Sequence, residues 1–306
     1  MANTISTIAA SLLQDLYAIP PFSALKTAAD SGSLFKSPEA FLASVFRTAE
    51  GSIASDKQLD VHYRSIIDSI VTSLPEDSIE YQYIVLAEEF RFIKEKYLVF
   101  RSGEVSSFYT TLKQDWARSL KLFSLYDDAL KKLEPSLHDI DDTFEFVSLI
   151  DRTYLIVLAG LAKQSDAYLR GVVKEKIEQY NIMTTLRMAQ LGKSRELIES
   201  LFVTEGLADT YALEHLEYRD VVSEIGLLLG MRPDMISVTT IETALFNREM
   251  ATINKATFEG VSGARIIQYV EQLRFFISNM KVVFAGVAMG LAEEEITKRF
   301  VAYNAQ

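Results

Sequence analysis

The feature that most restricts the fold is a stretch without proline between Pro135 and Pro233. Proline breaks helices because it has no N–H and its ring clashes with the preceding turn. The whole chain of 306 residues has only 6 Pro and 13 Gly. Apolar residues recur at helical spacing, as in GVVKEKIEQYNIMTTLRMAQLG at 171–192. Alternating strand patterns bounded by turn residues are not found. The sequence therefore predicts an all-α protein.

Capping residues predict where several helices begin and end. Ser37 and Pro38 suit the N-cap and first position of a short helix that stops before Gly51. Ser73 and Glu76 have the spacing of a capping box, which pairs an N-cap hydroxyl with a carboxylate three residues later. We therefore expect a long helix to start at this pair.

Three further boundaries follow from the same signals. Thr239 and Glu242 have capping-box spacing and predict a helix that reaches Gly260. The segment 113–133 is predicted to be helical, and 135–142 reads as a connecting loop because it combines Pro, Ser and Asp. Helical patterning resumes after this loop.

Composition and charge exclude several functions. Hydrophobic residues make up 49% of the chain and charged residues 24%, which is the range of folded globular proteins. The absence of Cys excludes disulfides, thiolate zinc sites and cysteine nucleophiles. The net charge is −11, and no Lys/Arg cluster interleaved with aromatic residues offsets it. We therefore expect no nucleic-acid partner and no direct binding to anionic lipid.

The chain is also not predicted to cross a membrane. Its longest apolar runs, which begin at Tyr154 and Val282, are about half of the roughly 20 residues that a spanning helix needs. The segment 1–16 lacks a basic region followed by a long apolar core, so it reads as an ordinary first helix rather than a signal peptide. A cytoplasmic location is expected.

A spacing recurs along the chain. Asn181 precedes Gly192 by eleven residues, and Asn279 precedes Gly290 by the same number. A fainter copy ends at Gly103. A glycine that stops a helix can adopt a left-handed conformation, after which a second helix returns apolar residues to the first. The pattern predicts a repeated hinge-and-return unit.

The spacing of the three glycines, at 103, 192 and 290, predicts units of about a hundred residues. We expect three alike helical domains over 1–112, 113–205 and 206–306. In the first copy Phe92 stands where the other two have Asn. The two asparagines are interpreted as structural residues, either satisfied interior amides or solvent-facing positions, rather than as ligand contacts.

Two segments carry a resemblance to a known family. YNIMTTLRMAQLGKSRELI at 180–198 resembles the N-[IL]-x(3)-L-R-x(4)-G signature of the C subunit of V-type and A-type ATPases, the counterpart of the d subunit in eukaryotic vacuolar ATPases. NMKVVFAGVAMGLAEEEITKRF at 279–300 is similar to the closing helix of that family, with its Gly-Leu turn and acidic start.

The resemblance implies a funnel of three pseudo-equivalent helical domains with no catalytic apparatus and no cofactor. Such a subunit lies in the central stalk, between the membrane rotor ring and the shaft subunits. It couples the two during ion transport and ATP synthesis or hydrolysis. The expected partners are therefore the shaft subunits and the ring. The resemblance also implies a cytoplasmic protein that is held at the membrane by the complex.

The most specific alternative to a stalk subunit is a magnesium-dependent enzyme. Asp141, Asp142 and Glu145, in the segment DDTFE, match the DDxxE pattern with which all-α terpene cyclases bind magnesium and diphosphate. The second cluster that such enzymes need is incomplete, because Arg219 and Leu227 stand at two of its ligand positions. A generic helical adaptor without a rotary role is the third hypothesis.

Other metal sites are not predicted. His138 and Asp139 lie beside the acidic pair, but adjacent acids in a loop are usually solvated. His62 and His215 have no partner residue at a metal-binding spacing, so each is interpreted as a packing or surface histidine.

Overall fold

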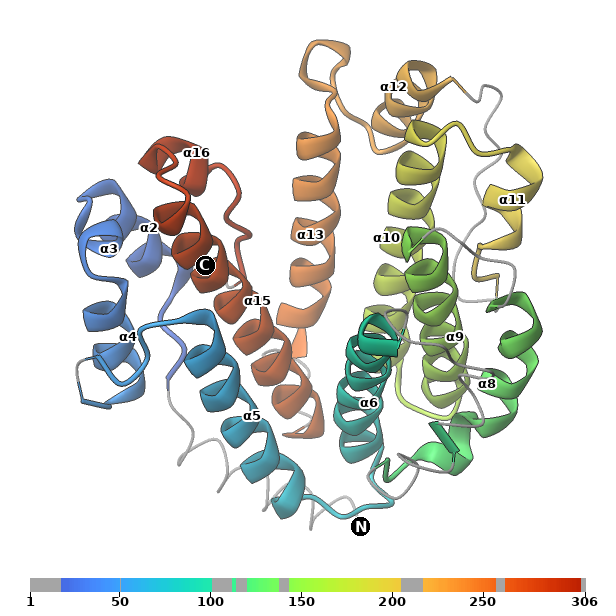
Figure 1. Ribbon diagram of the computed structural model, residues 1–306, viewed down its shortest axis with the longest axis horizontal. Helices are drawn as coiled ribbons and strands as arrows, with labels where there is room; N and C mark the ends of the chain where they lie inside the picture. Colours follow the sequence, from blue (N-terminus) through green and yellow to red (C-terminus); the bar gives the residue numbers. More distant parts are fainter. Residues whose placement is uncertain are drawn as a thin grey trace. The chain divides into compact units, whose positions relative to one another are not determined.

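The computed structural model describes residues 18–49, 51–100, 112–113, 120–137, 143–204, 217–256 and 262–303. Within these ranges the regular elements are helices and there is no strand, which confirms the all-α prediction (Figure 1). In chain order the elements are α2 (Phe22–Asp30), α3 (Ser33–Lys36), α4 (Pro38–Phe46), α5 (Asp56–Ser73), α6 (Ile79–Phe100), α8 (Phe123–Leu137), α9 (Thr143–Lys163), α10 (Ala167–Gln190), α11 (Arg195–Ser200), α12 (Tyr218–Leu228), the 3-10 turn η3 (Pro233–Met235), α13 (Val238–Asn254), α15 (Ser262–Ala288) and α16 (Glu293–Thr297).

The chain separates into two compact units. Unit 1 combines the two ends of the chain, residues 1–80 and 246–306, and unit 2 is the middle, residues 81–245. The unit boundaries fall inside α6 and α13. The division into domains 1–112, 113–205 and 206–306 stays a prediction.

Unit 1 is built around α15. This helix packs against α3, α4, α5 and α16, and α16 packs in turn against α2. The ring of Phe276 on α15 contacts Phe46 and Tyr303 edge-on, with ring centroids 6.0 and 5.9 Å apart. The Tyr303 hydroxyl donates a hydrogen bond of 2.8 Å to the carbonyl oxygen of Pro20. The last described residues are thereby tied to the first.

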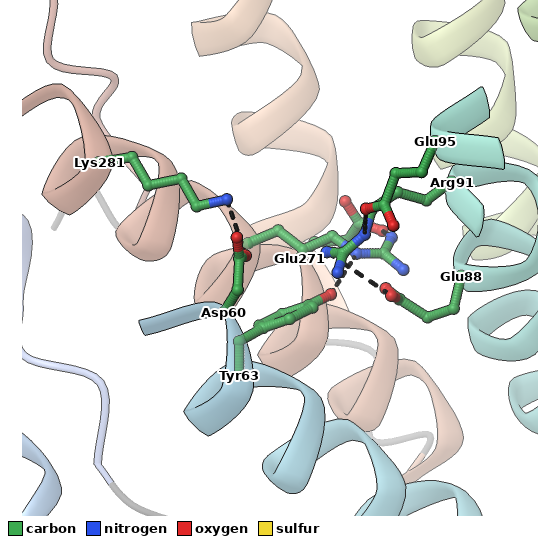
Figure 2. Close-up of polar contacts among 8 residues, drawn as sticks. Asp60, Tyr63, Glu88, Arg91, Glu95, Glu271 and Lys281 are labelled. Atoms are coloured by element: carbon green, nitrogen blue, oxygen red, sulfur yellow. Dashed lines mark hydrogen bonds and ion pairs between the residues drawn. The ribbon is translucent and has the colours of Figure 1, made fainter. Parts of the chain in front are cut away.

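Polar contacts fix the register of α5 on α15. The Lys281 ammonium lies 2.7 Å from a carboxylate oxygen of Asp60, and Figure 2 shows the two side chains pointing toward each other. One turn along α5, the Tyr63 hydroxyl accepts a hydrogen bond of 3.1 Å from Arg274. Arg274 also pairs at 2.6 Å with Glu271, which is buried. A buried carboxylate needs such a partner because it has lost its hydration.

Unit 2 is built around α10. This helix packs against α9, α11 and α12, and α8 packs against α9 (Figure 1). One face of α10 forms an apolar cluster with α12 and the first half of α13, whose buried members include Ile182, Leu186, Val221, Ile225 and Ile241. Another face buries Met188 against α11. The two apolar faces of α10 are therefore both covered.

The start of the short helix at Pro38 was predicted correctly, and the helix ends before Gly51 as expected, although a different residue stops it. Helix α4 begins at Pro38 with Ser37 at the N-cap position, although the Ser37 hydroxyl donates to the Glu39 carboxylate instead of accepting from the backbone. The helix stops at Arg47, which takes the left-handed conformation with φ of 52°. Gly51 also has a positive φ, but it lies in the following turn.

The capping box at Ser73 and Glu76 was wrong. Ser73 is the last residue of α5, and its hydroxyl donates to the Ser69 carbonyl oxygen. Helix α6 begins at Ile79. The serine therefore closes one helix rather than opening the next.

The capping box predicted at Thr239 and Glu242 was also wrong, because the helix is capped two residues earlier, at Ser237. The Ser237 hydroxyl accepts from the Thr240 N–H at 3.1 Å, and the Thr240 hydroxyl accepts from the Ser237 N–H at 2.9 Å. This is the same reciprocal arrangement with a threonine in place of the carboxylate. Glu242 instead lies 3.8 Å from Arg187 on α10.

The loop predicted over 135–142 was wrong at its start, because α8 continues through Pro135 to Leu137. The rest of that segment lies outside the described residues. The same is true of Gly260, the predicted end of the helix from Thr239, and of the first predicted helix at 1–16.

A buried carboxylate joins α6 to the start of α8. Glu89 accepts a hydrogen bond of 3.0 Å from the Leu122 N–H and one of 2.6 Å from the Tyr126 hydroxyl. Burial raises the pKa of Glu89, although both hydrogen bonds act in the opposite direction. Burial and the nearby carboxylate also raise the pKa of Tyr126.

The pKa of Glu89 predicts a pH dependence of stability. The folded state holds this proton to higher pH than the unfolded state, where a glutamate has a pKa of about 4.3. The free energy of unfolding therefore falls as the pH rises from about 4.3 through the raised folded-state value. We expect Glu89→Gln to remove this part of the slope in urea unfolding followed by circular dichroism. Glu95→Gln, a half-exposed position on the same helix, serves as the control. Equal slopes in the wild type and Glu89→Gln would contradict the assignment.

Candidate functional site

Asn181 lies in the middle of α10 and is fully buried. Its amide nitrogen donates a hydrogen bond of 3.1 Å to the Val203 carbonyl oxygen, and its amide oxygen accepts one of 3.0 Å from the Val203 N–H. Both polar groups of the side chain are thus bonded, as a buried amide requires. The same two bonds satisfy the backbone of the segment that follows α11.

Asn279 makes the same pair of bonds in the other unit. It lies within α15 and is 1% exposed. Its amide nitrogen donates to the Val301 carbonyl oxygen at 2.8 Å, and its amide oxygen accepts from the Val301 N–H at 2.9 Å. In both units the asparagine and its backbone partner are 22 residues apart.

A left-handed glycine turns the chain in each unit. Gly192 has φ of 65° and Gly290 has φ of 67°. The residue after each glycine donates back to the helix: Lys193 N–H to Met188 at 3.0 Å, and Leu291 N–H to the carbonyl oxygen of residue 286 at 2.9 Å. This is the bond that defines a Schellman C-cap.

A short helix then returns an isoleucine to the core. Ile198 on α11 and Ile296 on α16 are 3% and 1% exposed. Phe202 and Phe300, which follow each short helix, are buried as well. Each hinge-and-return unit is therefore a long helix, a glycine turn, a short helix and a non-helical segment that the asparagine holds.

Gly103, the glycine of the predicted first copy, lies outside the described residues. Phe92 in that copy is half-buried on α6, and the Lys96 ammonium lies over its ring, 5.3 Å from the centroid. A phenylalanine cannot make the two amide hydrogen bonds.

The candidate magnesium site is mostly outside the described residues, which do not include Asp141, Asp142, His138, Asp139 or His215. Glu145 is described. It lies in the first turn of α9, with a carboxylate oxygen 3.6 Å from the Lys193 ammonium. Within the described ranges, no group of three His, Asp or Glu side chains is arranged to hold a metal ion. His62 packs edge-on against Phe46, and burial lowers its pKa.

Sequence patterns did not predict the buried carboxylates. Besides Glu89, the residues Glu178, Glu249 and Glu271 are buried. A charged residue in a helical pattern is assigned to the exposed face, because charged residues are rarely buried unless they are paired. The partner that allows burial is not visible in the pattern. Glu178 has such a partner in Lys174, one turn earlier on α10, at 3.4 Å.

Exposed apolar side chains gather near the glycine turns. Eight large apolar side chains are exposed in the described part of the chain. Five of them lie within three residues before a glycine with positive φ, at position 192, 230 or 290, and they are Leu191, Leu227, Leu228, Val287 and Met289. They lie at the C-terminal ends of α10, α12 and α15.

The fold places the chain in the class of all-α proteins, and the hinge-and-return unit occurs in it twice within the described residues. Within the described ranges, no helix is both long and apolar enough to cross a membrane. The family model of the ATP synthase (C/AC39) subunit matches residues 64–299. The chain therefore belongs to this family, whose members are structural subunits of V/A-type ATP synthases rather than catalytic ones. A comparison with curated protein sequences finds no match.

Replacing either asparagine should destabilise the protein strongly. Asn181→Ala and Asn279→Ala each leave a backbone N–H and carbonyl of the return segment without their partner. We expect each change to lower the free energy of unfolding by about 2 kcal/mol or more. Urea unfolding measures the effect, and Asn247→Ala, at an exposed position on α13, is the control. Similar values for all three variants would show that the amides do not hold the return segments.

The glycine turns lead to a second expectation. A Cβ at residue 192 or 290 meets no atom within 4 Å, so its penalty is conformational. Gly192→Ala and Gly290→Ala should each cost about 1 kcal/mol because an L residue resists the left-handed region.

Gly160→Ala is the matched control, because residue 160 lies inside α9 and also has open space around it. Alanine there should stabilise the protein by about 0.5–1 kcal/mol. Thermal unfolding of the three variants gives the sign of each effect. A stabilised Gly192→Ala or Gly290→Ala would contradict the assigned turn.

Proposed function

We propose that this chain is the non-catalytic central-stalk subunit of a V/A-type rotary ATPase, and that it couples the shaft subunits to the membrane rotor ring. The observation that carries the proposal is the family match over residues 64–299. On this proposal the chain takes part in ion transport and in ATP synthesis or hydrolysis without performing chemistry itself. It is cytoplasmic, and partner subunits hold it at the membrane.

The hinge-and-return units suit a mechanical role. A subunit that passes torque must resist local bending. Each unit is closed by two hydrogen bonds of 2.8–3.1 Å between a buried amide and the backbone of the return segment. Such bonds are hard to open, because opening leaves buried polar groups unpaired.

We further propose that the chain is built from three alike helical domains, 1–112, 113–205 and 206–306, that form a funnel. The matched separation of 22 residues between Asn181 and Val203 and between Asn279 and Val301 supports the repeat. Gly192 and Gly290 occupy like places in the two copies.

The exposed apolar side chains near the glycine turns are our candidates for partner contacts. Leu228 and Met289 are 59% and 65% exposed. Burial of such side chains against another subunit is favourable at about 25 cal/mol per Å² of apolar surface. The chain's net charge of −11 would favour partner loops that carry positive charge.

Affinity capture tests the proposal. The tagged chain is captured from gently solubilised membranes, and the bound proteins are identified by mass spectrometry. We expect the shaft subunits and the ring subunit of one rotary ATPase, because a central-stalk subunit binds both. The matched control is an equally tagged, unrelated acidic helical protein.

Two results would overturn the proposal. Capture of unrelated client proteins would support the generic adaptor. Magnesium-dependent release of diphosphate from a prenyl diphosphate, lost in Asp141→Ala, would support the cyclase.

A further inference from the structure

A third glycine turn has the backbone geometry of the two hinge-and-return units, and it joins α12 to α13 in unit 2. Gly230 has φ of 73°. The Met231 N–H donates to the Gly226 carbonyl oxygen at 2.9 Å, and the Gly230 N–H donates to the Leu227 carbonyl oxygen at 2.9 Å. These are the two bonds of a Schellman C-cap. We name residues 226–237 the Gly230 hinge.

An isoleucine packs against a glycine in the same register at two of the three turns. Ile236 follows Gly226 by ten residues, and Ile296 follows Gly286 by ten residues. A Cβ added at residue 226 would lie 2.5 Å from the Ile236 side chain, and one added at residue 286 would lie 2.5 Å from the Ile296 side chain. Glycine allows this close approach because it has no Cβ. The contact between Ile236 and Gly226 therefore closes the Gly230 hinge.

The Gly230 hinge differs in the hydrogen bonds that hold it. Eleven residues before the glycine, where the hinge-and-return units have a buried asparagine, it has the exposed Arg219. In the part of the chain that the structure describes, the hydrogen bonds of residues 231–237 join positions at most five apart, such as the bond of 2.8 Å from the Thr240 hydroxyl to the Met235 carbonyl oxygen. The asparagine bonds of the hinge-and-return units span 22 residues. Opening the Gly230 hinge therefore breaks local bonds rather than a tertiary one.

The isoleucine of the Gly230 hinge is also less buried than its counterparts. Ile236 is half-buried, and the residues before it, 232–235, are exposed. Ile198 and Ile296 are 3% and 1% exposed. A segment with few buried apolar contacts and solvent-exposed hydrogen bonds opens at a lower free energy than the core around it. The Gly230 hinge should therefore open more often than the other two turns.

Opening would change the apolar surface of unit 2. Leu227 and Leu228 are exposed at the end of α12, and Met235 is exposed on the far side of the glycine turn. When Ile236 leaves Gly226, Met235 moves relative to the two leucines. The exposed apolar side chains at this turn are therefore adjustable, whereas those at the asparagine-held turns are fixed.

We propose that the Gly230 hinge is a conformational device that opens on its own while the two hinge-and-return units stay closed, and that the contact between Ile236 and Gly226 sets how often it opens. The proposal rests on contacts within unit 2 and on their counterparts at the other two turns. It does not depend on the proposed role in a rotary ATPase.

Residue-resolved amide hydrogen exchange of the full chain tests the proposal. The N–H groups of Met231, Lys193 and Leu291 make equivalent bonds of 2.9, 3.0 and 2.9 Å in the three turns. After correction for intrinsic exchange rates, we expect Met231 to exchange about tenfold faster than the other two, or more, because a local opening has a lower free energy than unfolding of the surrounding core. Equal protection at the three positions would overturn the proposal.

Gly226→Ala and Gly286→Ala are a matched pair of variants, because each adds a methyl group 2.5 Å from an isoleucine. In Gly226→Ala the hinge should open, so the exchange of Met231 should rise about tenfold while the melting temperature falls by less than about 2 °C. In Gly286→Ala the return segment is held by Asn279, so overpacking should lower the melting temperature by about 5 °C or more. Equal losses of melting temperature in the two variants would overturn the proposal.

Ile236→Ala removes the closing contact without adding bulk. We expect faster exchange at Met231 and unchanged exchange at Lys193, which lies in the same unit but at an asparagine-held turn. The comparison separates a local opening from a general loosening of unit 2. Equal acceleration at both positions, or none at Met231, would overturn the assigned role of Ile236.

Discussion

The structure depends on how an all-α protein provides hydrogen-bond partners for backbone groups that lie outside its helices. A chain that leaves a helix and returns across it has N–H and carbonyl groups with no sheet to pair with. Asn181 and Asn279 solve this problem with one amide each, because an amide carries a donor and an acceptor side by side. The return segments can therefore be buried, and the short helices α11 and α16 can cover the ends of α10 and α15.

This arrangement places opposing demands on the helix that carries the asparagine. Asparagine is a poor residue for a helix interior, because its side chain competes for backbone hydrogen bonds. In α10 and α15 the side chain points away from its own backbone and bonds a segment 22 residues later. The local penalty is therefore offset by tertiary bonds. A hinge closed in this way resists bending.

The sequence predicted the helical class and the two glycine turns because both depend on local chemistry: periodicity within a helix and the left-handed preference of glycine. Helix ends were predicted less well. Ser73 has the residue type of an N-cap but closes α5, and a left-handed arginine at 47 ends α4 before Gly51. Hydroxyl residues two positions apart can each suit an N-cap, and residue type alone does not choose between them. Ser237 with Thr240, rather than Thr239 with Glu242, was such a choice.

The contacts that close the hinge units could not be predicted, for a physical reason. The asparagine binds the backbone of residue 203 or 301, so the side chain at that position takes no part in the bond. The bond itself does not select the residue type at that position, and both units have valine there. Sequence therefore marks only one end of the contact. The same holds for the buried Glu89, whose partner in the chain is the backbone N–H of Leu122 as much as the Tyr126 hydroxyl.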